Sequence, residues 1–409
     1  MSLPELLAPA GSFACAQAAF DHGADAVYAG IGKFNLRAHS PNFTVKEFCD
    51  LMRYASGLGR RVYAALNIMP DDKMLDSLRL TLEELCGLGG VPDAFIVSDP
   101  GVLSVISELC PDAELHLSTQ TGCFNSASMR FWKGQGVNRV VLPRELNLEQ
   151  IKHLSGLDIM ETEVFVHGAM CVSVSGRCLL GAYLGKRHPN LGDCPQPCRF
   201  NYRIIPQEAG MKTDHDGFWV EESESGAYLL NSKDLCTLEI LPELIQTGAA
   251  SFKIEGRNKS AHYVASVVKV YRDALDTAEA GPENYQLKPW WMDELNSIEH
   301  RTYTCGFYNS DPFKQDLFAS KASAGFRLVG MVKAVIEGRP VVDVKNSFSN
   351  RTRINVLPVR QRLEPYDLLF ESLMELDGRV VEKACSNRLV VLEGCSERLR
   401  TGDMLRVKV

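Results

Sequence analysis

The sequence ELLAPAGSFACAQAAFDHGADAVYAG, which occupies residues 5–30, contains the repeating unit that decides the fold. A short apolar run at Glu5–Pro9 is followed by an amphipathic helical pattern over Phe13–Asp21 and by a second apolar run at Ala26–Gly30. Gly23 stands just after the helical pattern, where glycine often takes the left-handed conformation that ends a helix. This order predicts a strand, a helix and a second strand of a βα repeat.

The same unit recurs through about the first 260 residues. Further strands are expected at Val62–Asn67, Ala94–Asp99, Leu115–Ser118, Val140–Pro143, Val164–His167 and Phe252–Glu255. These runs are short and apolar throughout, which is typical of strands that are buried on both faces of a parallel sheet. The repeat predicts an α/β fold, either a doubly wound sheet or a TIM-barrel-like (β/α)8 domain, and the count favours the barrel. A ninth run, Tyr228–Asn231, exceeds the count, so one of the nine is expected outside the ring.

The chain divides into three predicted parts. The barrel domain is expected over residues 1–280, ending in a long helix at about Ala261–Ala280, with an insertion at 168–226 after the seventh strand. An insertion of this length inside a barrel is usually functional. A connector is expected at 281–324. Short apolar runs separated by turn residues then predict a small C-terminal β-barrel domain over 325–409.

The charge of the chain limits its partners. The net charge of −7 gives no overall attraction to nucleic acid, so any contact with RNA needs a local basic surface. Residues 321–362 supply nine Lys or Arg against only Glu337 and Asp343, which makes the β domain a candidate RNA-binding surface; the alternative is an ordinary solvated sheet face. No export signal and no run of about 20 apolar residues is present, so we expect a cytoplasmic protein with reduced thiols.

Four cysteines lie close together in the insertion: Cys171, Cys178, Cys194 and Cys198. Their flanks are polar and rich in glycine and proline, unlike those of a buried structural cysteine. Four thiolates can complete an iron–sulfur cluster or a tetrahedral zinc site. Structural zinc prefers two closely spaced pairs, and only Cys194 and Cys198 have that spacing, so iron–sulfur is the preferred interpretation. Cys236 can replace one of the four.

Polar residues follow the predicted strands, at the end of a barrel where catalytic groups gather. They include Asn67, Asp99, Ser118, Gln120, Arg144, Glu145, His167, Asn231, Lys233, Glu255 and Arg257. Arginine can hold a carboxylate or phosphate with two parallel hydrogen bonds, so this set predicts a site for an anionic ligand. We predict catalytic roles for His167, Glu255 and Arg257, and ligand binding by Gln120, Arg144, Asn231 and Lys253. For His167 the role is open between acid–base catalysis, support of a neighbouring group and a structural contact. Helix capping is the alternative for Asp99 and Ser118.

The stretch EVFVHGAMCVSVSGRC, residues 163–178, resembles the signature of the peptidase U32 family, E-x-F-x-x-G-[SA]-[LIVM]-C-x4-G-x-C-x-[LIVM]-S. The match continues through Leu180, and Gly181 stands where serine is usual. Essentially the whole chain shares the resemblance, which is also carried by residues 4–11, 23–30, 116–120, 231–235 and 253–257.

The resemblance implies a specific activity. It is strongest to the branch of the family that hydroxylates tRNA, which implies 5-hydroxylation of the wobble uridine in the anticodon loop, with the dicarboxylate prephenate as co-substrate. It also implies a [4Fe–4S] cluster held by Cys171, Cys178, Cys194 and Cys198. Some relatives act in pairs, so a partner protein of the same family is a further implication.

A peptidase is the alternative that the family name suggests. The sequence contains no HExxH or GxSxG motif, and no phosphate-binding or dinucleotide-binding glycine motif. A nucleophilic Cys171 next to His167 would leave the other three insertion cysteines without a role, so hydroxylation is the preferred function.

Overall fold

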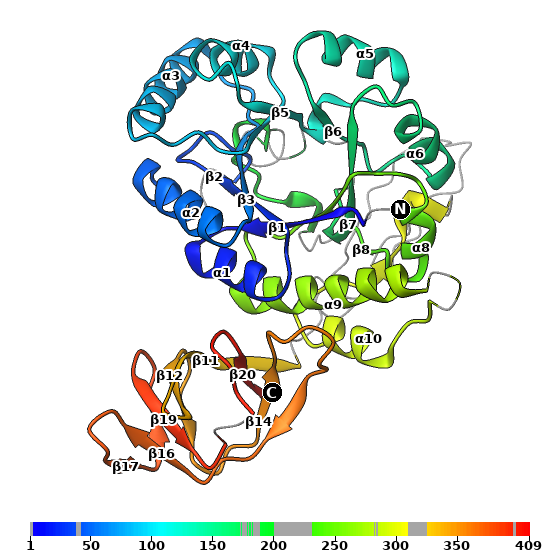
Figure 1. Cartoon of the computed structure of the whole chain (residues 1–409). Helices are drawn as coiled ribbons and strands as arrows, with labels where there is room; N and C mark the ends of the chain where they lie inside the picture. The colour runs from blue at the N-terminus through cyan, green and yellow to red at the C-terminus, as the bar shows by residue number, and fades with distance from the viewer. Residues whose placement is uncertain are drawn as a thin grey trace, which may run out of the picture.

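The structure is a computed structural model that describes residues 3–37, 42–171, 173, 178, 180, 182, 189–199, 231–281, 283, 285–309, 325–395 and 398–409. These residues form a barrel of strands surrounded by helices and, below it in Figure 1, an antiparallel β domain. None of the helices in these ranges is long and apolar enough to cross a membrane.

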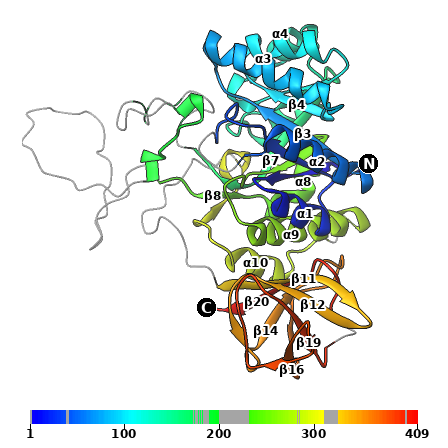
Figure 2. The same cartoon turned by 90° about the vertical axis from the view of Figure 1, so that its left-hand side faces the viewer.

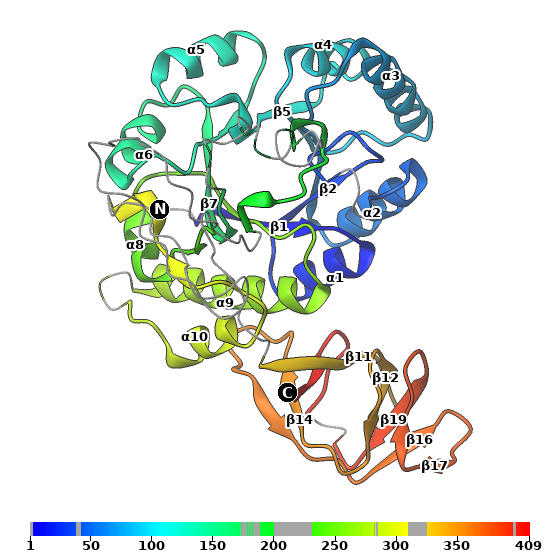
Figure 3. The same cartoon turned by 180° about the vertical axis from the view of Figure 1, so that it is seen from behind.

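Eight parallel strands close into a ring, which Figures 1 and 3 show from opposite sides. They are β1 (Glu5–Ala10), β2 (Ala26–Gly30), β3 (Arg61–Leu66), β4 (Ala94–Val97), β5 (Glu114–Leu117), β6 (Arg139–Val141), β7 (Glu161–Ala169) and β9 (Ser251–Ile254). Strand β9 pairs in parallel with both β7 and β1, which closes the ring. The TIM-barrel-like fold and the eight strands expected from the sequence are therefore confirmed.

Helices cover the outside of the ring. They are α1 (Phe13–Asp21), α2 (Val45–Gly57), α3 (Asp72–Gly87), α4 (Pro100–Leu109), α5 (Ser126–Gly134), α6 (Leu148–Ser155), α8 (Leu241–Ile245) and α9 (Ala261–Ala280). Most begin at a polar side chain that accepts a hydrogen bond from the first turn, as Ser12 does for α1 and Asp99 for α4. The long helix α9 has the predicted bounds and packs on α1.

Two short strands extend the sheet outside the ring. Strand β8 (Asp234–Cys236) pairs antiparallel with the end of β7, and β10 (Tyr303–Thr304) pairs with β8 after helix α10 (Pro289–Asn296). Residues 228–230 of the ninth predicted strand lie outside the described residues, and Asn231 is not in a strand.

The inside of the barrel is divided into an apolar and a charged side. Six apolar side chains from β1 to β4 form one small cluster: Leu7, Ala26, Tyr28, Tyr63, Ala94 and Ile96. Strands β6, β7 and β9 contribute the buried charges of Arg139, Glu163 and Lys253, and Glu5 at the start of β1 joins them. Barrel interiors are usually filled by layers of branched apolar residues, so the charged side calls for a functional explanation.

The β domain has its own apolar core. Its main sheet is antiparallel with the order β15-β14-β20-β11-β12-β19-β16-β17, and it curls as Figure 2 shows. The strands are β11 (Phe326–Ile336), β12 (Arg339–Val344), β14 (Ile354–Leu357), β15 (Tyr366–Leu368), β16 (Ser372–Glu375), β17 (Val380–Val381), β19 (Leu389–Glu393) and β20 (Met404–Lys408), with β13 (Phe348–Ser349) and β18 (Lys383–Ala384) paired separately. This confirms a small C-terminal β domain.

Candidate functional site

A cavity of about 150 Å³ opens at the carboxyl ends of the barrel strands. Strand residues form its walls and the segments that follow the strands form its rim, as expected for the catalytic end of a barrel. The walls are Tyr28, Ala65, Ile96, Val141, Phe165 and Lys253, and the rim is Leu36, Arg37, Asn67, Ser118, Thr119, Gln120, Arg144, Cys171, Glu255 and Arg257. The structure thus brings together five of the predicted catalytic or ligand-binding residues: Gln120, Arg144, Lys253, Glu255 and Arg257.

An amide is fixed at one edge of the cavity. The Gln120 side chain donates from Nε2 to the Asn67 carbonyl oxygen at 3.0 Å and accepts from Ser118 Oγ at 3.0 Å. The Gln120 side chain is buried, and these two hydrogen bonds fix its orientation before any ligand binds.

Arg144 presents a cation to the cavity. Its Nη1 donates to the Ala169 carbonyl oxygen at 2.6 Å, and its guanidinium lies 4.0 Å from the centre of the Phe165 ring. The Nε atom is buried without a hydrogen-bond partner, and no carboxylate among the described residues forms an ion pair with Arg144. A bound anion can supply the missing partner.

Arg37 and Arg257 flank the carboxylate of Glu255. Arg37 Nη2 lies 3.2 Å from Glu255 Oε1, while Arg257 donates to the side chain of the neutral Asn35. Burial, with the nearby charge of Arg37, lowers the pKa of Arg257 to about 10. Two guanidinium groups with one carboxylate leave the rim with excess positive charge, which favours an anionic ligand.

Arg37 is a site residue that the sequence analysis missed. It lies seven residues beyond the end of β2 at Gly30, whereas the prediction considered residues directly after each strand. The loop after β2 folds back over the strand ends, with Phe43 N donating to the Gly30 carbonyl oxygen at 3.1 Å. Extending the search through the whole loop after each strand would have found Arg37.

Lys253 forms the floor of the cavity on its charged side. Its Nζ lies 2.8 Å from Glu163 Oε1, 4.5 Å from the centre of the Tyr28 ring and 5.7 Å from that of Phe165. Glu163 also lies 3.4 Å from Arg139, which in turn lies 2.7 Å from Glu5. Burial opposes ionisation of Glu163, yet the charges of Lys253 and Arg139 outweigh it and lower its pKa to about 2. The lysine is thereby held in place from below.

The four insertion cysteines are free thiols beside the cavity. Cys171 lines the cavity and is exposed; Cys178, Cys194 and Cys198 are half-buried, with Cys194 and Cys198 near the 3-10 turn Pro197–Arg199. Burial raises the pKa of Cys198, and the charges of Cys171, Cys194 and Cys178 raise it further, so the sulfur atoms share one neighbourhood.

The four cysteines match a metal centre in their chemistry but not in their positions. Four free thiols from one segment are the donor set of an iron–sulfur or zinc site. Among the described residues, however, no three His, Cys, Asp or Glu side chains are gathered as metal ligands. Electrostatic interactions act over distances much longer than a metal–sulfur bond. The two observations are therefore compatible, because the thiols lie near one another but are not arranged around one point as metal ligands.

Cys236 lies in the protein core. It is buried on β8 opposite His167, with its sulfur 3.8 Å from the Tyr271 hydroxyl, and burial raises its pKa to about 11. Its surroundings are core side chains rather than the cavity.

His167, a predicted catalytic residue, does not line the cavity. Its ring is buried at 5.5 Å from the rings of Tyr271 and Tyr303, and burial lowers its pKa to about 3. A shift in the pairing of β7 with β9 between Phe165 and His167 explains this placement, because such a bulge changes the side to which the next side chain points. The backbone of His167 still serves the site, since its carbonyl oxygen accepts from Glu255 N at 2.9 Å.

The remaining predicted residues lie elsewhere. Asn231 is buried and accepts from Arg301 Nη1 at 3.3 Å, next to the ion pair of Arg301 with Asp234. Asp99 caps helix α4. Glu145 and Lys233 are not part of the cavity wall.

The basic stretch of the β domain is partly neutralised. Arg339, Lys345 and Arg353 pair with Glu393, Asp343 and Asp367, and Lys321 lies outside the described residues. Exposed Arg327, Lys333, Arg351 and Arg362 form no ion pair with another described residue. The charge available to RNA is smaller than the sequence count suggests.

Fold and site together define a TIM-barrel-like protein with a cation-lined cavity beside a cysteine-bearing insertion. The family model for Peptidase family U32 matches residues 11–317, and the chain belongs to this family. It is similar to "tRNA hydroxylation protein P1" of Bacillus subtilis, at 32% identity over 98% of this chain and 94% of that protein. It is also similar to "tRNA hydroxylation protein P" of Escherichia coli, at 36% identity over 85% of each chain. The "23S rRNA 5-hydroxycytidine C2501 synthase" of Escherichia coli is 33% identical over 87% of this chain and 53% of its own length.

Proposed function

We propose that this protein is an RNA-hydroxylating enzyme that adds a hydroxyl group at position 5 of the wobble uridine of tRNA, with prephenate as co-substrate. The names of the relatives support RNA hydroxylation, because two act on tRNA and one on ribosomal RNA. The observation that carries the proposal is that Cys171 lines the same cavity as Arg144, Lys253 and Arg257. A cysteine site and an anion site therefore meet at one place.

The cavity suits a ring that carries carboxylates. A volume of about 150 Å³ is comparable to engineered protein cavities that accommodate benzene, so one six-membered ring fits. Tyr28, Ile96 and Phe165 provide apolar contacts, and Arg144 and Arg257 provide cations for carboxylate groups. A uridine would reach the cavity only after leaving its stack, which costs little in a single-stranded anticodon loop.

Cys171, Cys178, Cys194 and Cys198 would hold the [4Fe–4S] cluster. Such a group supplies one-electron transfer next to the cavity. The chain's own residues would bind and orient the substrates: Gln120 offers a fixed amide, Arg144 and Arg257 hold the anion, and Glu255 is a carboxylate within reach of a ligand proton.

Contact with tRNA would come from local charge, since the chain as a whole carries −7. The exposed cations Arg327, Lys333, Arg351 and Arg362 of the β domain are candidates for phosphate contacts. Affinity for tRNA should then fall steeply with salt concentration.

A peptidase is the weaker candidate, because no histidine is among the described residues that line the cavity with Cys171. The histidine closest in sequence to Cys171, His167, is buried among tyrosines and lies outside the cavity. Thiol catalysis needs a base within hydrogen-bonding reach of the sulfur.

The proposal is tested in cells that lack the gene. These cells are complemented with the wild-type protein, Cys178→Ala, Arg144→Gln or Cys385→Ala, and 5-hydroxyuridine derivatives are measured in their tRNA. Each protein is also purified without oxygen for iron, sulfide and visible absorption.

We expect Cys178→Ala to lose both colour and the modified nucleoside, and Arg144→Gln to lose the nucleoside but keep the colour. Cys385 is exposed in the β domain, and its replacement should change neither. Colourless, iron-free wild-type protein would refute the cluster, and unchanged nucleosides in the deletion strain would refute the tRNA assignment.

A further inference from the structure

Lys253 is the only amine among the described residues that line the cavity. The other cations of the barrel interior and rim are arginines: Arg37, Arg139, Arg144 and Arg257. Arginine is the usual choice for a buried ion pair and keeps its proton at all relevant pH values. A lysine at the floor of the cavity differs in one chemical respect, because its amine can act as a nucleophile toward a carbonyl group.

The nitrogen of Lys253 is fixed in position at the floor of the cavity. Glu163 lies 2.8 Å from Nζ, is itself fully buried and does not line the cavity, so it fixes the lysine from the side opposite to a ligand. The rings of Tyr28 and Phe165, at 4.5 and 5.7 Å from Nζ, shield it and stabilise a positive charge on the nitrogen. Glu163 therefore acts as a positioning residue for Lys253.

The cations at the rim of the cavity determine which ligands bind next to the amine. Arg144 pairs with no carboxylate among the described residues, and the hydrogen bond of Arg257 goes to the neutral Asn35. A ligand carboxylate that binds these two groups places the adjoining carbon atom in the same 150 Å³ cavity as the amine.

We propose that Lys253 condenses with the carbonyl group of an α-keto acid whose carboxylate is bound by Arg144 and Arg257. The inference rests on the proposed function only in taking this cavity as the site of a small organic anion. It needs neither the cysteine site nor RNA.

The reaction balances within the cavity. A bond forms between Nζ and the carbonyl carbon, the carbon–oxygen bond breaks, and the oxygen leaves as water. Overall, an ammonium and a ketone become an iminium and water, so the charge beside Glu163 is unchanged and no oxidant is needed. Two protons move from the nitrogen to the oxygen: the ammonium loses the first before it attacks, and the second is lost after the bond has formed. Glu255 lines the same cavity and can carry both in turn, first to the carbonyl oxygen and then to the hydroxyl group that leaves as water.

The test uses chemical trapping. The purified full chain is incubated with pyruvate and cyanoborohydride, which reduces an iminium to a stable secondary amine, and digested peptides are then identified by mass spectrometry. We expect one reduced adduct on the Lys253 peptide with pyruvate. Lactate, which lacks the carbonyl group, should give none, and acetone, which lacks the carboxylate, should react about tenfold less.

Matched variants separate this reaction from random labelling. Lys253→Arg keeps the charge but removes the amine, and it should abolish the specific adduct. Arg144→Gln should reduce the adduct about tenfold. Lys133→Arg, at an exposed position of α5, should leave it unchanged.

Labelling that survives Lys253→Arg, or that is equal for pyruvate and acetone, would overturn the inference. The two proposals fail separately. A trapped Lys253 with unmodified tRNA would refute the proposed function alone, and normal tRNA hydroxylation without any adduct would refute the condensation alone.

Discussion

Glu163 is the centre of the charges inside the barrel. It is fully buried and lies within 3.4 Å of Arg139 and 2.8 Å of Lys253. Removing one member of a buried ion network usually costs more than the network contributes, because the partner charge is left unpaired. The site therefore depends on a carboxylate that does not line the cavity.

Replacing this carboxylate should destabilise the protein. Glu163→Gln is expected to lower the free energy of unfolding by about 3–5 kcal/mol, measured by denaturant titration. Glu161→Gln removes a half-exposed partner of Arg139 on the same strand and should cost less than about 1 kcal/mol. Because the pKa of Glu163 is lowered to about 2, its contribution is complete above its ordinary pKa of 4.5 and disappears as the pH falls toward 2. Equal midpoints for the two variants would contradict this role.

Four buried histidines among the described residues make the fold sensitive to acid. Burial lowers the pKa of His22 and His262 to about 4 and that of His167 to about 3, and it also lowers the pKa of His116. Between pH 6.5 and about 4 the unfolded chain binds protons that the folded chain does not, so stability falls as the pH falls. The free energy of unfolding should drop by up to about 5 kcal/mol per pH unit, and His167→Phe should reduce this slope by about 1.4 kcal/mol per pH unit. A slope unchanged in His167→Phe would mean that the histidine is protonated in the fold.

The site residues could be predicted only where the chain is regular. Gln120, Arg144 and Glu255 lie just after strands end, so the rule that catalytic groups follow barrel strands found them. Arg37 was missed because it lies within a long loop. His167 was predicted to be catalytic, but a bulge in β7 turns its side chain into the core, away from the cavity, and the sequence carries no visible signal for a bulge.

At the scale of elements, three glycines make room for one segment. A Cβ atom at Gly11 would lie 2.1 Å from the Arg257 carbonyl oxygen, one at Gly30 would lie 2.6 Å from Arg257 Nη1, and one at Gly168 would lie 2.6 Å from the Glu255 carbonyl oxygen. The ends of β1, β2 and β7 thus close around the segment after β9 that carries Glu255 and Arg257. The strands themselves were predictable from their apolar runs, but these approaches depend on the closure of the ring.

A side chain at one of these glycines should impair ligand binding more than it impairs folding. In Gly30→Ala the new methyl group also meets the side chains of Asn35 and Asn42, at 2.3 and 2.6 Å, so Arg257 must move. We expect the affinity for prephenate, measured by calorimetry, to fall at least about tenfold, while the helical content of the protein stays unchanged. Gly57→Ala at the end of α2, where nothing lies within 4 Å, should bind normally and gain up to about 1 kcal/mol of stability. Normal affinity in Gly30→Ala would show that Arg257 does not touch the anion.

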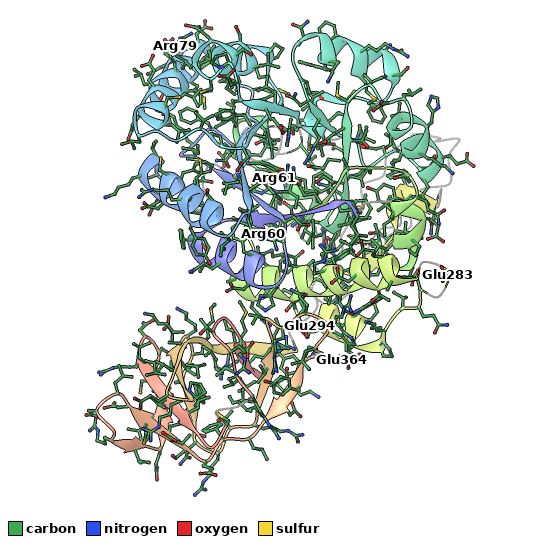
Figure 4. The ribbon with its side chains drawn as sticks, viewed as in Figure 1. Arg60, Arg61, Arg79, Glu283, Glu294 and Glu364 are labelled. Atoms are coloured by element: carbon green, nitrogen blue, oxygen red, sulfur yellow. The ribbon has the colours of Figure 1, made fainter. Side chains whose placement is uncertain are left out.

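At the scale of the whole molecule, one ion pair joins the two domains. Arg406 on β20 reaches out of the β domain and holds both carboxylate oxygens of Glu294 on α10, at 2.6 and 2.5 Å. Figure 4 labels Glu294 where the barrel and the β domain meet. The pair is almost fully buried, and the apolar side chains of Ala18, Ala265 and Met404 pack nearby. The sequence alone could not indicate this interdomain ion pair, because its two residues are 112 positions apart and belong to different domains.

Breaking this pair should loosen the β domain from the barrel. In Arg406→Met the buried charge of Glu294 loses its partner, which should cost about 3–5 kcal/mol and separate the unfolding of the domains into two calorimetric transitions. The double variant Arg406→Met with Glu294→Leu removes both charges and should recover most of this loss. Arg353→Met breaks an exposed pair with Asp367 inside the β domain and should change stability by at most about 1 kcal/mol.

If the exposed cations of the β domain bind tRNA, Arg406→Met should also weaken tRNA binding, since those cations would no longer be held at a fixed position relative to the cavity. A single transition with unchanged tRNA affinity in Arg406→Met would show that the other contacts, which include the apolar packing and the hydrogen bond of Lys269 to the Arg360 carbonyl oxygen, fix the two domains.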